Sequence, residues 1–353
     1  MHVDAEPVRV AVVGYGLGGS VFHAPLVSVT PRLSLDVIVT SHSDRQAAAR
    51  QRYPGVAVVD GMDELLARAG DLDLAVVTVP NAAHVAVATA ALAAGLSVVI
   101  DKPVAPGAAE VEAVADMAGA LGRLAVPYHN RRWDGDFRTL RRLVCDGAVG
   151  EVWRFESRFE RWRPAVPDAP SWKHDPSQAA GGILFDLGPH LIDQAVVLFG
   201  LPASVYAEMP RRRGALDDDT FVALSYPGGL IVHLWMSSRA AQRGPRFRVL
   251  GSEGSYVKWG LDVQEDALRA GHLPTEPGWG EEPPGAWGRL SSDEGAEAVP
   301  TLPGAYQDFY RGVAASLLDG AAPPVTMTDA VIGARIIEAV IASAATGTAV
   351  TIG

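Results

Sequence analysis

Residues 10–22 read VAVVGYGLGGSVF, an apolar run that breaks into a glycine-rich turn and continues into a helix-like stretch. The turn has the spacing G-x-G-x-x-G. Its first glycine permits a tight turn, the second lets the backbone approach a pyrophosphate, and the third lets the helix lie close to the strand. The N–H groups at the start of the helix then face the phosphates. The stretch predicts a dinucleotide-binding loop lined by Gly14, Gly16, Leu17, Gly18 and Gly19.

Beyond this loop, the first third of the chain alternates strand and helix patterns. Short apolar runs separated by helical patterns lie at residues 8–13, 33–40, 57–59, 74–79, 97–100 and 124–127. Such runs are typical of parallel strands whose two faces are both covered by helices. After residue 128, strands follow one another with short turns, which is typical of an antiparallel sheet.

We therefore predict an α/β protein of two domains, as expected for 353 residues. Residues 1–127 are predicted to form a Rossmann domain with a parallel sheet. Residues 128–353 are predicted to form an α+β domain with a mostly antiparallel open sheet, and its C-terminal helix can pack back on the first domain. Residues 270–303 are rich in Gly, Pro and Glu, and we interpret them as an irregular excursion or flexible flap.

The composition restricts the partners and the compartment. A net charge of −11 argues against nucleic acid, because phosphate binding needs a basic face. Residues 74–100 carry no Asp, Glu, Lys or Arg and could span a bilayer, but Pro80-Asn81 and Gly95 divide them into strand, helix and strand. The single Cys145 cannot form an internal disulfide, which indicates a reducing compartment. With no signal-peptide pattern at the N-terminus, we expect a cytoplasmic protein that binds neither membrane nor nucleic acid.

Polar side chains follow the fourth, fifth and sixth predicted strands. The carboxyl ends of parallel strands share one edge of the sheet, and ligands bind beyond that edge. Turn residues are often polar, so an ordinary turn also explains each group taken alone. Lys102 stands out, because a cation beside the nicotinamide can hydrogen-bond a substrate oxygen whose negative charge grows during hydride transfer. The cofactor-binding candidates at this edge are Thr78, Pro80, Asn81, His84, Asp101 and Lys102. The substrate-binding candidates are Tyr128, Asn130, Arg131, Trp172 and Lys173, although the tryptophan is equally explained as core.

A second group of polar residues lies in residues 181–193, which read GGILFDLGPHLID. On a helix, Asp186 and His190 stand four residues apart on one face, and both are further candidates for substrate binding. An aspartate beside an imidazole fixes its tautomer and raises its basicity, which suits removal of a proton from an alcohol. A surface pair has the same spacing, and a metal site would lack a third clear ligand, so we predict no metal. Pro189 costs about 3 kcal/mol in a regular helix, so we expect the helix to kink or to begin near it.

The end of the second strand bears on the choice of cofactor. An NAD site usually has an acidic residue there, hydrogen-bonded to the ribose. Asp36 stands too early in the strand and Asp44 lies beyond the turn. The residues placed to receive a 2′-phosphate are Ser41, His42, Ser43 and Arg45. NADP is therefore favoured, with NAD as the alternative.

Taken together, these motifs resemble the Gfo/Idh/MocA family of NAD(P)-dependent oxidoreductases over essentially the whole chain. The matching pieces are GYGLGGS at 14–20, DKP at 101–103 in place of the usual EKP, and G-G-x-x-x-D-x-G-x-H-x-x-D at 181–193. Within the family, SVFHAPL at 20–26, YHNRRWD at 128–134 and QEDALRAG at 264–271 resemble the branch that contains NADP-dependent scyllo-inositol dehydrogenase.

The resemblance implies a dehydrogenase acting on a cyclic polyol or sugar, with Lys102, Asp186 and His190 as the catalytic set. It also implies that the second domain binds substrate and builds an oligomer interface, so we expect a homodimer or homotetramer. A non-catalytic NAD(P)-binding regulatory protein of the same fold is the alternative, because the family's fold includes such a protein.

Overall fold

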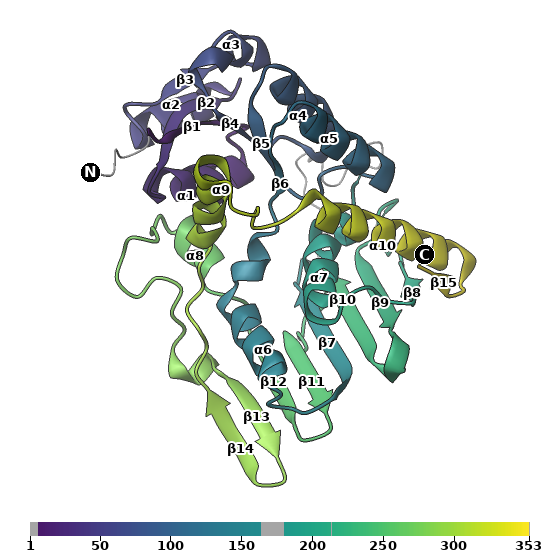
Figure 1. Ribbon diagram of the computed structural model, residues 1–353. Coiled ribbons are helices and arrows are strands. Elements are labelled where there is room, and N and C mark those ends of the chain that lie inside the picture. The colour runs from purple at the N-terminus through teal and green to yellow at the C-terminus, as the bar shows by residue number, and fades with distance from the viewer. Residues whose placement is uncertain (1–5, 164–179, 213, 353) are drawn as a thin grey trace. The chain divides into compact units, whose positions relative to one another are not determined.

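The computed structural model describes residues 6–163, 180–212 and 214–352. They divide into two compact units (Figure 1). The first unit contains the chain up to Asn130 together with Gln264–Trp279 and Ala305–Val331. The second contains Arg131–Val263, Gly280–Gly304 and the chain from Ile332 onward.

The first unit is built on a parallel sheet, as predicted. Within the described residues its strands run in the order β3-β2-β1-β4-β5-β6, and each neighbouring pair is parallel. They are β1 (Val8–Val13), β2 (Leu33–Val39), β3 (Ala57–Val59), β4 (Leu74–Val77), β5 (Ser97–Ile100) and β6 (Ala125–Pro127). Every residue of β4 and β5 is buried, because helices cover both faces of the sheet. Strand order reverses between β1 and β4, and ligands bind at such a switch point.

Helices alternate with the strands of this unit, as the sequence pattern predicts. Those between the strands are α2 (Ser43–Arg52), α3 (Met62–Leu66), α4 (His84–Ala93) and α5 (Ala108–Ala120). The helix-like stretch after the glycine loop begins as a π-helical turn, η1 (Gly18–His23), and continues as α1 (Ala24–Val29). Pro25 stands in the first turn of α1, where its missing N–H is tolerated. Two later helices also belong to this unit: α8 (Gln264–Arg269) contacts η1, and α9 (Gln307–Asp319) contacts α1 and β1.

The second unit is built on a mostly antiparallel sheet, which also confirms the prediction. Its strand order in the described residues is β14-β13-β12-β11-β7-β10-β9-β8-β15. The pair β7–β10 is parallel and all other pairs are antiparallel. The strands are β7 (Val152–Glu160), β8 (Ser204–Glu208), β9 (Asp219–Ser225), β10 (Ile231–Ser237), β11 (Phe247–Gly251), β12 (Ser255–Lys258), β13 (Gly288–Ser292), β14 (Gly295–Val299) and β15 (Val350–Thr351). One sheet face packs with α6 (Gly135–Cys145), α7 (Ile183–Phe199) and the later turns of α10 (Met327–Thr346) to form the core.

The interpretation of residues 270–303 as an irregular excursion or flap is wrong. Strands β13 and β14 in this segment form a hairpin that extends the sheet beyond β12. A buried ion pair holds the segment in place: Lys258 Nζ lies 3.0 Å from Glu282 Oε2 and donates to the carbonyl of Ala286 at 2.9 Å. Composition did not indicate this pair, because its two residues are 24 positions apart.

Of the two outcomes expected at Pro189, a kink or the start of a helix, the second is wrong. Helix α7 runs without interruption from Ile183 to Phe199, with Pro189 inside it. Leu184, Leu187, Leu191 and Ile192 on this helix are at most 2% exposed. Each fully buried side chain of this size contributes about 1.5–3 kcal/mol, which outweighs the cost of the proline.

No helix in the part of the chain that the structure describes is both long and apolar enough to cross a bilayer.

Candidate functional site

The glycine loop packs directly on the end of β4. A Cβ built on Gly14 would lie 2.4 Å from the carbonyl oxygen of Thr78, and one on Gly18 would lie 2.1 Å from Thr78 Oγ1. A Cβ on Gly19 would lie 2.0 Å from the carbonyl oxygen of Gly14, so the loop also closes on itself. Gly14 has a φ of +102°, a conformation that disfavours any side chain. The structure therefore brings the predicted loop and Thr78 together, and no larger residue fits at these three positions.

Asp101 and Lys102 follow β5 at the same edge of the sheet. Asp101 Oδ1 accepts the backbone N–H of Lys102 at 2.8 Å, and Thr78 Oγ1 donates to Asp101 Oδ2 at 3.3 Å. Burial on its own would raise the pKa of the Asp101 carboxyl. The contact with His23, with smaller contributions from Lys102 and His84, outweighs burial and holds this pKa well below its usual range.

His84 ties the segments after β4 and β5 together. Its side chain is buried, with Nε2 2.8 Å from the carbonyl oxygen of Val79 and Nδ1 2.8 Å from that of Pro103. The neighbouring Pro80 and Asn81 begin a short 3₁₀ turn, η3 (Asn81–Ala83), and Asn81 is 8% exposed. The cofactor-binding candidates of this edge thus lie on two linked turns beside the glycine loop.

The turn after β2 carries the residues predicted for the 2′-phosphate. Ser41, His42, Ser43 and Arg45 are all exposed. The Arg45 guanidinium lies at the glycine loop, because a Cβ built on Gly16 would be 3.8 Å from its Nη1. Asp36 accepts a hydrogen bond from Ser34 within β2 and does not stand at the strand's end. The structure therefore places the Arg45 guanidinium beside the loop. Residues 40–43, which follow β2, contain no Asp or Glu.

His23 and its neighbours are functional candidates that the sequence reasoning missed. His23 is completely buried, with its ring 4.2 Å from that of Tyr128 and its Nδ1 2.6 Å from Tyr310 Oη. Tyr128 is 2% exposed, packs edge-on against Phe309 at 4.8 Å, and donates to the carbonyl of Phe22 at 3.3 Å. Tyr128 therefore has a packing role in this unit, and its contact with substrate stays a prediction.

In the second unit, the start of α7 is held by Asp217. Its Oδ2 accepts the N–H of Leu184 at 2.8 Å and the hydroxyl of Thr220 at 2.7 Å. Burial raises the pKa of the Asp217 carboxyl. Gly182 has a φ of +92°, and a Cβ there would lie 1.9 Å from Asp217 Oδ1. Gly182, the second glycine of the GG pair, is thus needed for the turn that precedes α7.

Helix α7 carries Asp186 and His190 four residues apart, so they share a face as predicted. His190 is 6% exposed. The Asp186 side chain is 25% exposed and lies 3.8 Å from Arg161 Nη1. Arg161, which the sequence reasoning missed, stacks on Phe159 at 4.8 Å.

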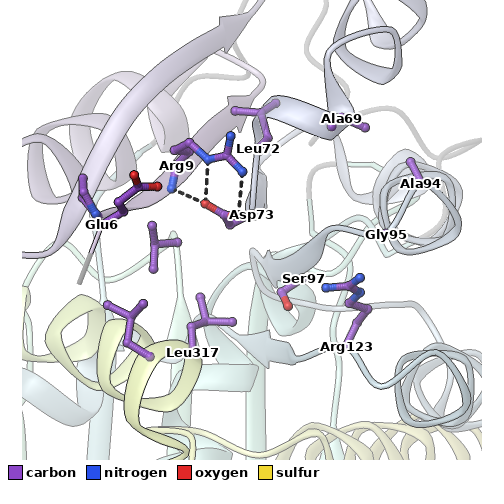
Figure 2. A pocket seen from close by; sticks show the side chains of 14 residues that line it. Glu6, Arg9, Ala69, Leu72, Asp73, Ala94, Gly95, Ser97, Arg123 and Leu317 are labelled. Carbon is purple, nitrogen blue, oxygen red and sulfur yellow. Dashed lines mark hydrogen bonds and ion pairs between the residues drawn. The ribbon is translucent and has the colours of Figure 1, made fainter.

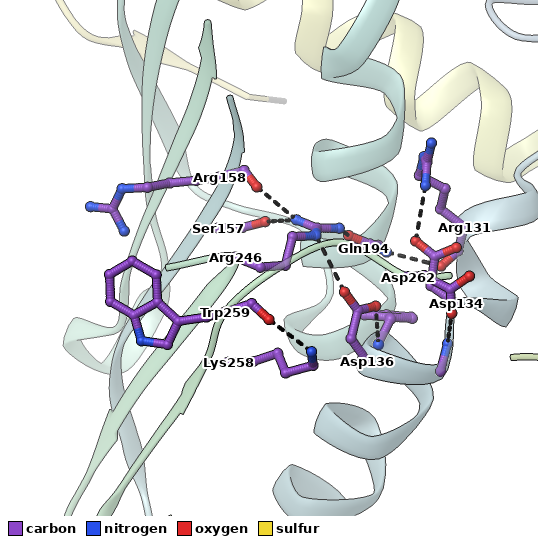
Figure 3. A network of polar contacts seen from close by, with 12 residues as sticks. Arg131, Asp134, Asp136, Ser157, Arg158, Gln194, Arg246, Lys258, Trp259 and Asp262 are labelled. Atoms are coloured by element: carbon purple, nitrogen blue, oxygen red, sulfur yellow. Dashed lines mark hydrogen bonds and ion pairs between the residues drawn. The ribbon is translucent and has the colours of Figure 1, made fainter. Parts of the chain in front are cut away.

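A network of polar side chains anchors the next turns of α7 (Figure 3). Gln194 donates to the carbonyl of Arg131 at 2.9 Å and accepts from Arg246 Nη2 at 2.8 Å. Arg246 is 1% exposed on its side chain and lies 3.6 Å from the completely buried Asp136. Asn130 and Arg131, predicted to bind substrate, are 5% and 6% exposed on the 3₁₀ segment η4 (Asn130–Trp133). Trp172 and Lys173 lie outside the described residues.

A cavity of about 540 Å³ lies elsewhere in the first unit (Figure 2). It is lined by Arg9 at the start of β1, Asp73 before β4 and Ser97 at the start of β5. Arg9 and Asp73 pair with each other across it, with Arg9 Nε 3.0 Å from Asp73 Oδ2. This is the amino edge of the sheet, opposite the glycine loop, so the cavity is not the candidate site. Among the described residues, no group of three or more His, Cys, Asp or Glu could hold a metal ion.

Comparison with known proteins agrees with this geometry in both units. Residues 8–129 match the model of an oxidoreductase family with an NAD-binding Rossmann fold, and residues 137–257 match the Gfo/Idh/MocA C-terminal domain. The chain belongs to the Gfo/Idh/MocA family. The resemblance predicted from the motifs is confirmed, and the chain is an oxidoreductase with an NAD-binding Rossmann fold.

Other members of the Gfo/Idh/MocA family match along nearly the whole chain. The chain is 37% identical to scyllo-inositol 2-dehydrogenase (NADP(+)) IolW of Bacillus subtilis, over 96% of this chain and 94% of that protein. It is 39% identical to the oxidoreductase YdgJ of Escherichia coli, over 96% and 97%. The solved structure of the oxidoreductase YvaA of Bacillus subtilis superposes with a TM-score of 0.92 at 33% identity, and covers all of both chains.

Proposed function

We propose that this oxidoreductase is an NADP-preferring dehydrogenase acting on a secondary alcohol of a cyclic polyol or sugar, with inositols as the leading substrates. The observation that carries the proposal is where the structure places three residues of the family-like motifs: Lys102 directly follows β5, and Asp186 and His190 stand four residues apart on α7. The NADP-dependent scyllo-inositol relative supports the same substrate class and cofactor.

The residues of the first unit fit a dinucleotide. The glycine loop presents backbone in place of side chains, because Gly14, Gly18 and Gly19 leave no room for a Cβ. Arg45 beside Gly16 supplies a guanidinium for a 2′-phosphate, and Ser41 supplies a hydroxyl. When bound, NADP⁺ accepts the hydride that leaves the substrate carbon.

The chain's own residues handle the proton and the developing charge. His190 takes the proton of the substrate hydroxyl, and Asp186 favours the protonated imidazole that results. The Lys102 ammonium hydrogen-bonds the oxygen as its negative charge grows. In the reverse direction His190 returns the proton to the carbonyl oxygen.

We further propose that the protein is a cytoplasmic homodimer or homotetramer that assembles through the second unit. Along β10, buried Val232, Leu234 and Met236 alternate with more exposed residues on the other sheet face. On that face His233, Trp235 and Phe221 form an aromatic cluster, with ring centroids 5.2–5.5 Å apart. An apolar cluster of this kind on an open sheet supports pairing with a second copy. The single cysteine supports a reducing location.

The experiment follows nicotinamide absorbance with NADP⁺ or NAD⁺ and a panel of inositols and aldoses. Lys102→Ala is expected to lower kcat by about 10²–10³-fold, because it removes the donor to the developing oxyanion. Arg123→Ala is the matched control, since this exposed cation lines the cavity at the opposite edge of the sheet. Parental turnover in Lys102→Ala would overturn the assignment of Lys102. NADP binding without turnover of any polyol or sugar would favour a non-catalytic regulatory protein instead.

A further inference from the structure

His23 is a buried titratable residue that the proposed reaction does not use. It stands in the SVFHAPL motif, at the last residue of η1, and has no exposed surface. Its two ring nitrogens face different polar groups: Nδ1 is 2.6 Å from Tyr310 Oη, and Nε2 is 3.5 Å from Asp101 Oδ2. His23 thus lies between the phenol of Tyr310 and the carboxylate of Asp101, and all three residues belong to the first unit. These two neighbours restrict which ring nitrogen can carry the proton.

The two neighbours decide which nitrogen carries the proton. Burial raises the pKa of Tyr310 well above its ordinary value, so this phenol keeps its proton and can donate to His23 Nδ1. The lone pair of an unprotonated Nε2 would face the carboxylate of Asp101, which is repulsive. The contacts therefore favour a chain in which Tyr310 O–H points to Nδ1 and Nε2–H points to Asp101.

Asp101 in turn contacts the segment that carries Lys102. It receives the backbone N–H of Lys102 on Oδ1 and the hydroxyl of Thr78 on Oδ2. The groups that lower its pKa come from three elements: His23 from η1, Lys102 from its own segment and His84 from α4. Its second oxygen also lies at the glycine loop, because a Cβ on Gly18 would be 3.0 Å away.

We propose that His23, oriented by Tyr310, is a positioning residue that holds Asp101 as a carboxylate and thereby fixes the backbone from which Lys102 reaches the substrate. This inference rests on the role proposed for Lys102. A misplacement of about 1 Å at a reacting group can cost about 100-fold in rate, so the effect belongs in kcat rather than in cofactor binding.

Two substitutions of similar size separate this role from simple packing. In His23→Gln the amide nitrogen can take the place of Nε2 and still donate to Asp101, whereas in His23→Asn the amide reaches only the place of Nδ1. We expect His23→Asn to lower kcat about tenfold to 100-fold, and His23→Gln to stay within about threefold of the parent because its donor is retained. The melting temperatures and the Kd for NADPH of both variants are measured alongside. Equal losses of kcat in the two variants would overturn the proposal.

The pH profile supplies a readout that a packing role would not move. The contact with His23 is the largest influence that lowers the pKa of Asp101, so removing it raises that pKa. Asp101 then takes up a proton at higher pH than in the parent. The pH at which the Asp101 carboxyl takes up its proton, followed by its ¹³Cγ chemical shift, should therefore rise in His23→Asn and not in His23→Gln. An unmoved Asp101 titration in His23→Asn counts against the proposal.

A measurement without turnover keeps this inference distinct from the proposed function. Long-range ¹H–¹⁵N spectra of protein labelled at histidine nitrogens report which ring nitrogen of His23 is protonated. We expect Nε2–H in the parent, assigned by its loss in His23→Gln, and a changed signal in Tyr310→Phe. An unprotonated Nε2 overturns the inference even in an active enzyme. If the parent turns over no polyol or sugar, the proposed function fails, while an Nε2–H signal that Tyr310→Phe disturbs would still support the orientation of His23.

Discussion

Arg132 and Asp193 form a two-point ion pair, with Arg132 Nε 2.8 Å from Asp193 Oδ2 and Nη2 2.6 Å from Oδ1. Their side chains are 15% and 6% exposed. The pair joins the YHNRRWD motif to the last residue of the motif that carries His190, and so ties η4 to α7. Two parallel hydrogen bonds give such a pair a defined geometry as well as energy.

Breaking this pair is expected to destabilise the second unit. Arg132→Ala leaves a nearly buried carboxylate without its partner and should lower the free energy of unfolding by about 3 kcal/mol. Arg132→Lys keeps the charge but cannot make both bonds, so its loss should be smaller. Urea denaturation of these variants, of Asp193→Asn and of the double variant gives the coupling energy. Additive losses would show that the two side chains do not act together.

Arg45 is expected to decide between the two nicotinamide cofactors. Removing one charge-assisted contact costs about 1.5–3 kcal/mol, so Arg45→Ala should weaken NADP⁺ binding by roughly ten- to 100-fold and leave NAD⁺ binding nearly unchanged. Arg50→Ala, one turn later on the same exposed helix, is the matched control. Ser41→Asp should turn the preference toward NAD⁺. The measurement is kcat/KM with each cofactor, and an unchanged ratio in Arg45→Ala would contradict the NADP assignment.

The close packing of the glycine loop can be tested at Gly19. The Cβ added by Gly19→Ala would meet the carbonyl oxygen of Gly14 at 2.0 Å, and backbone cannot move aside cheaply. We expect a loss of about 1–3 kcal/mol in the free energy of unfolding, together with weaker cofactor binding. Gly119→Ala is the control, because it lies within α5 and its Cβ would meet nothing within 4 Å. That substitution should stabilise the protein by about 0.5–1 kcal/mol.

Assembly through the outer face of the second sheet is tested at Trp235. Arg158 stacks over its ring at 3.9 Å, and Phe221 lies 5.2 Å from it. If a second copy covers this cluster, Trp235→Asp should weaken self-association by at least about 30-fold, since a central aromatic residue contributes about 2 kcal/mol or more. Light scattering after size exclusion measures the mass. Leu201→Asp, at a residue 55% exposed just after α7, should leave the mass unchanged.

Much of the first unit could be predicted because its signals are local. The apolar runs of β1, β4 and β5, and the glycines between β1 and η1, lie within a few residues of the contacts they determine. Residues 270–303 were misjudged for the opposite reason. Their order depends on Lys258 and Glu282, whose burial as a pair is invisible in a count of Gly, Pro and Glu.

Helix α7 shows the same contrast between local sequence signals and contacts with distant residues. Local reasoning about Pro189 predicted a kink or the start of the helix there, since the ring removes a hydrogen bond and clashes with the preceding turn. Burial of Leu184, Leu187 and Leu191 against the sheet overrides that preference. The energy of this burial comes from β7, β9 and β10, which neighbour the helix only in the folded chain.

Residue spacing alone was enough to identify the family, the nucleotide loop and the residues expected to carry the chemistry, because those features depend on neighbours along the chain. The partners of His23 could be found only in the folded protein: Asp101 is 78 positions away and Tyr310 is 287. Hydrogen bonds and ion pairs act over a few ångströms of space, and a linear sequence does not record which distant residues folding brings within that range.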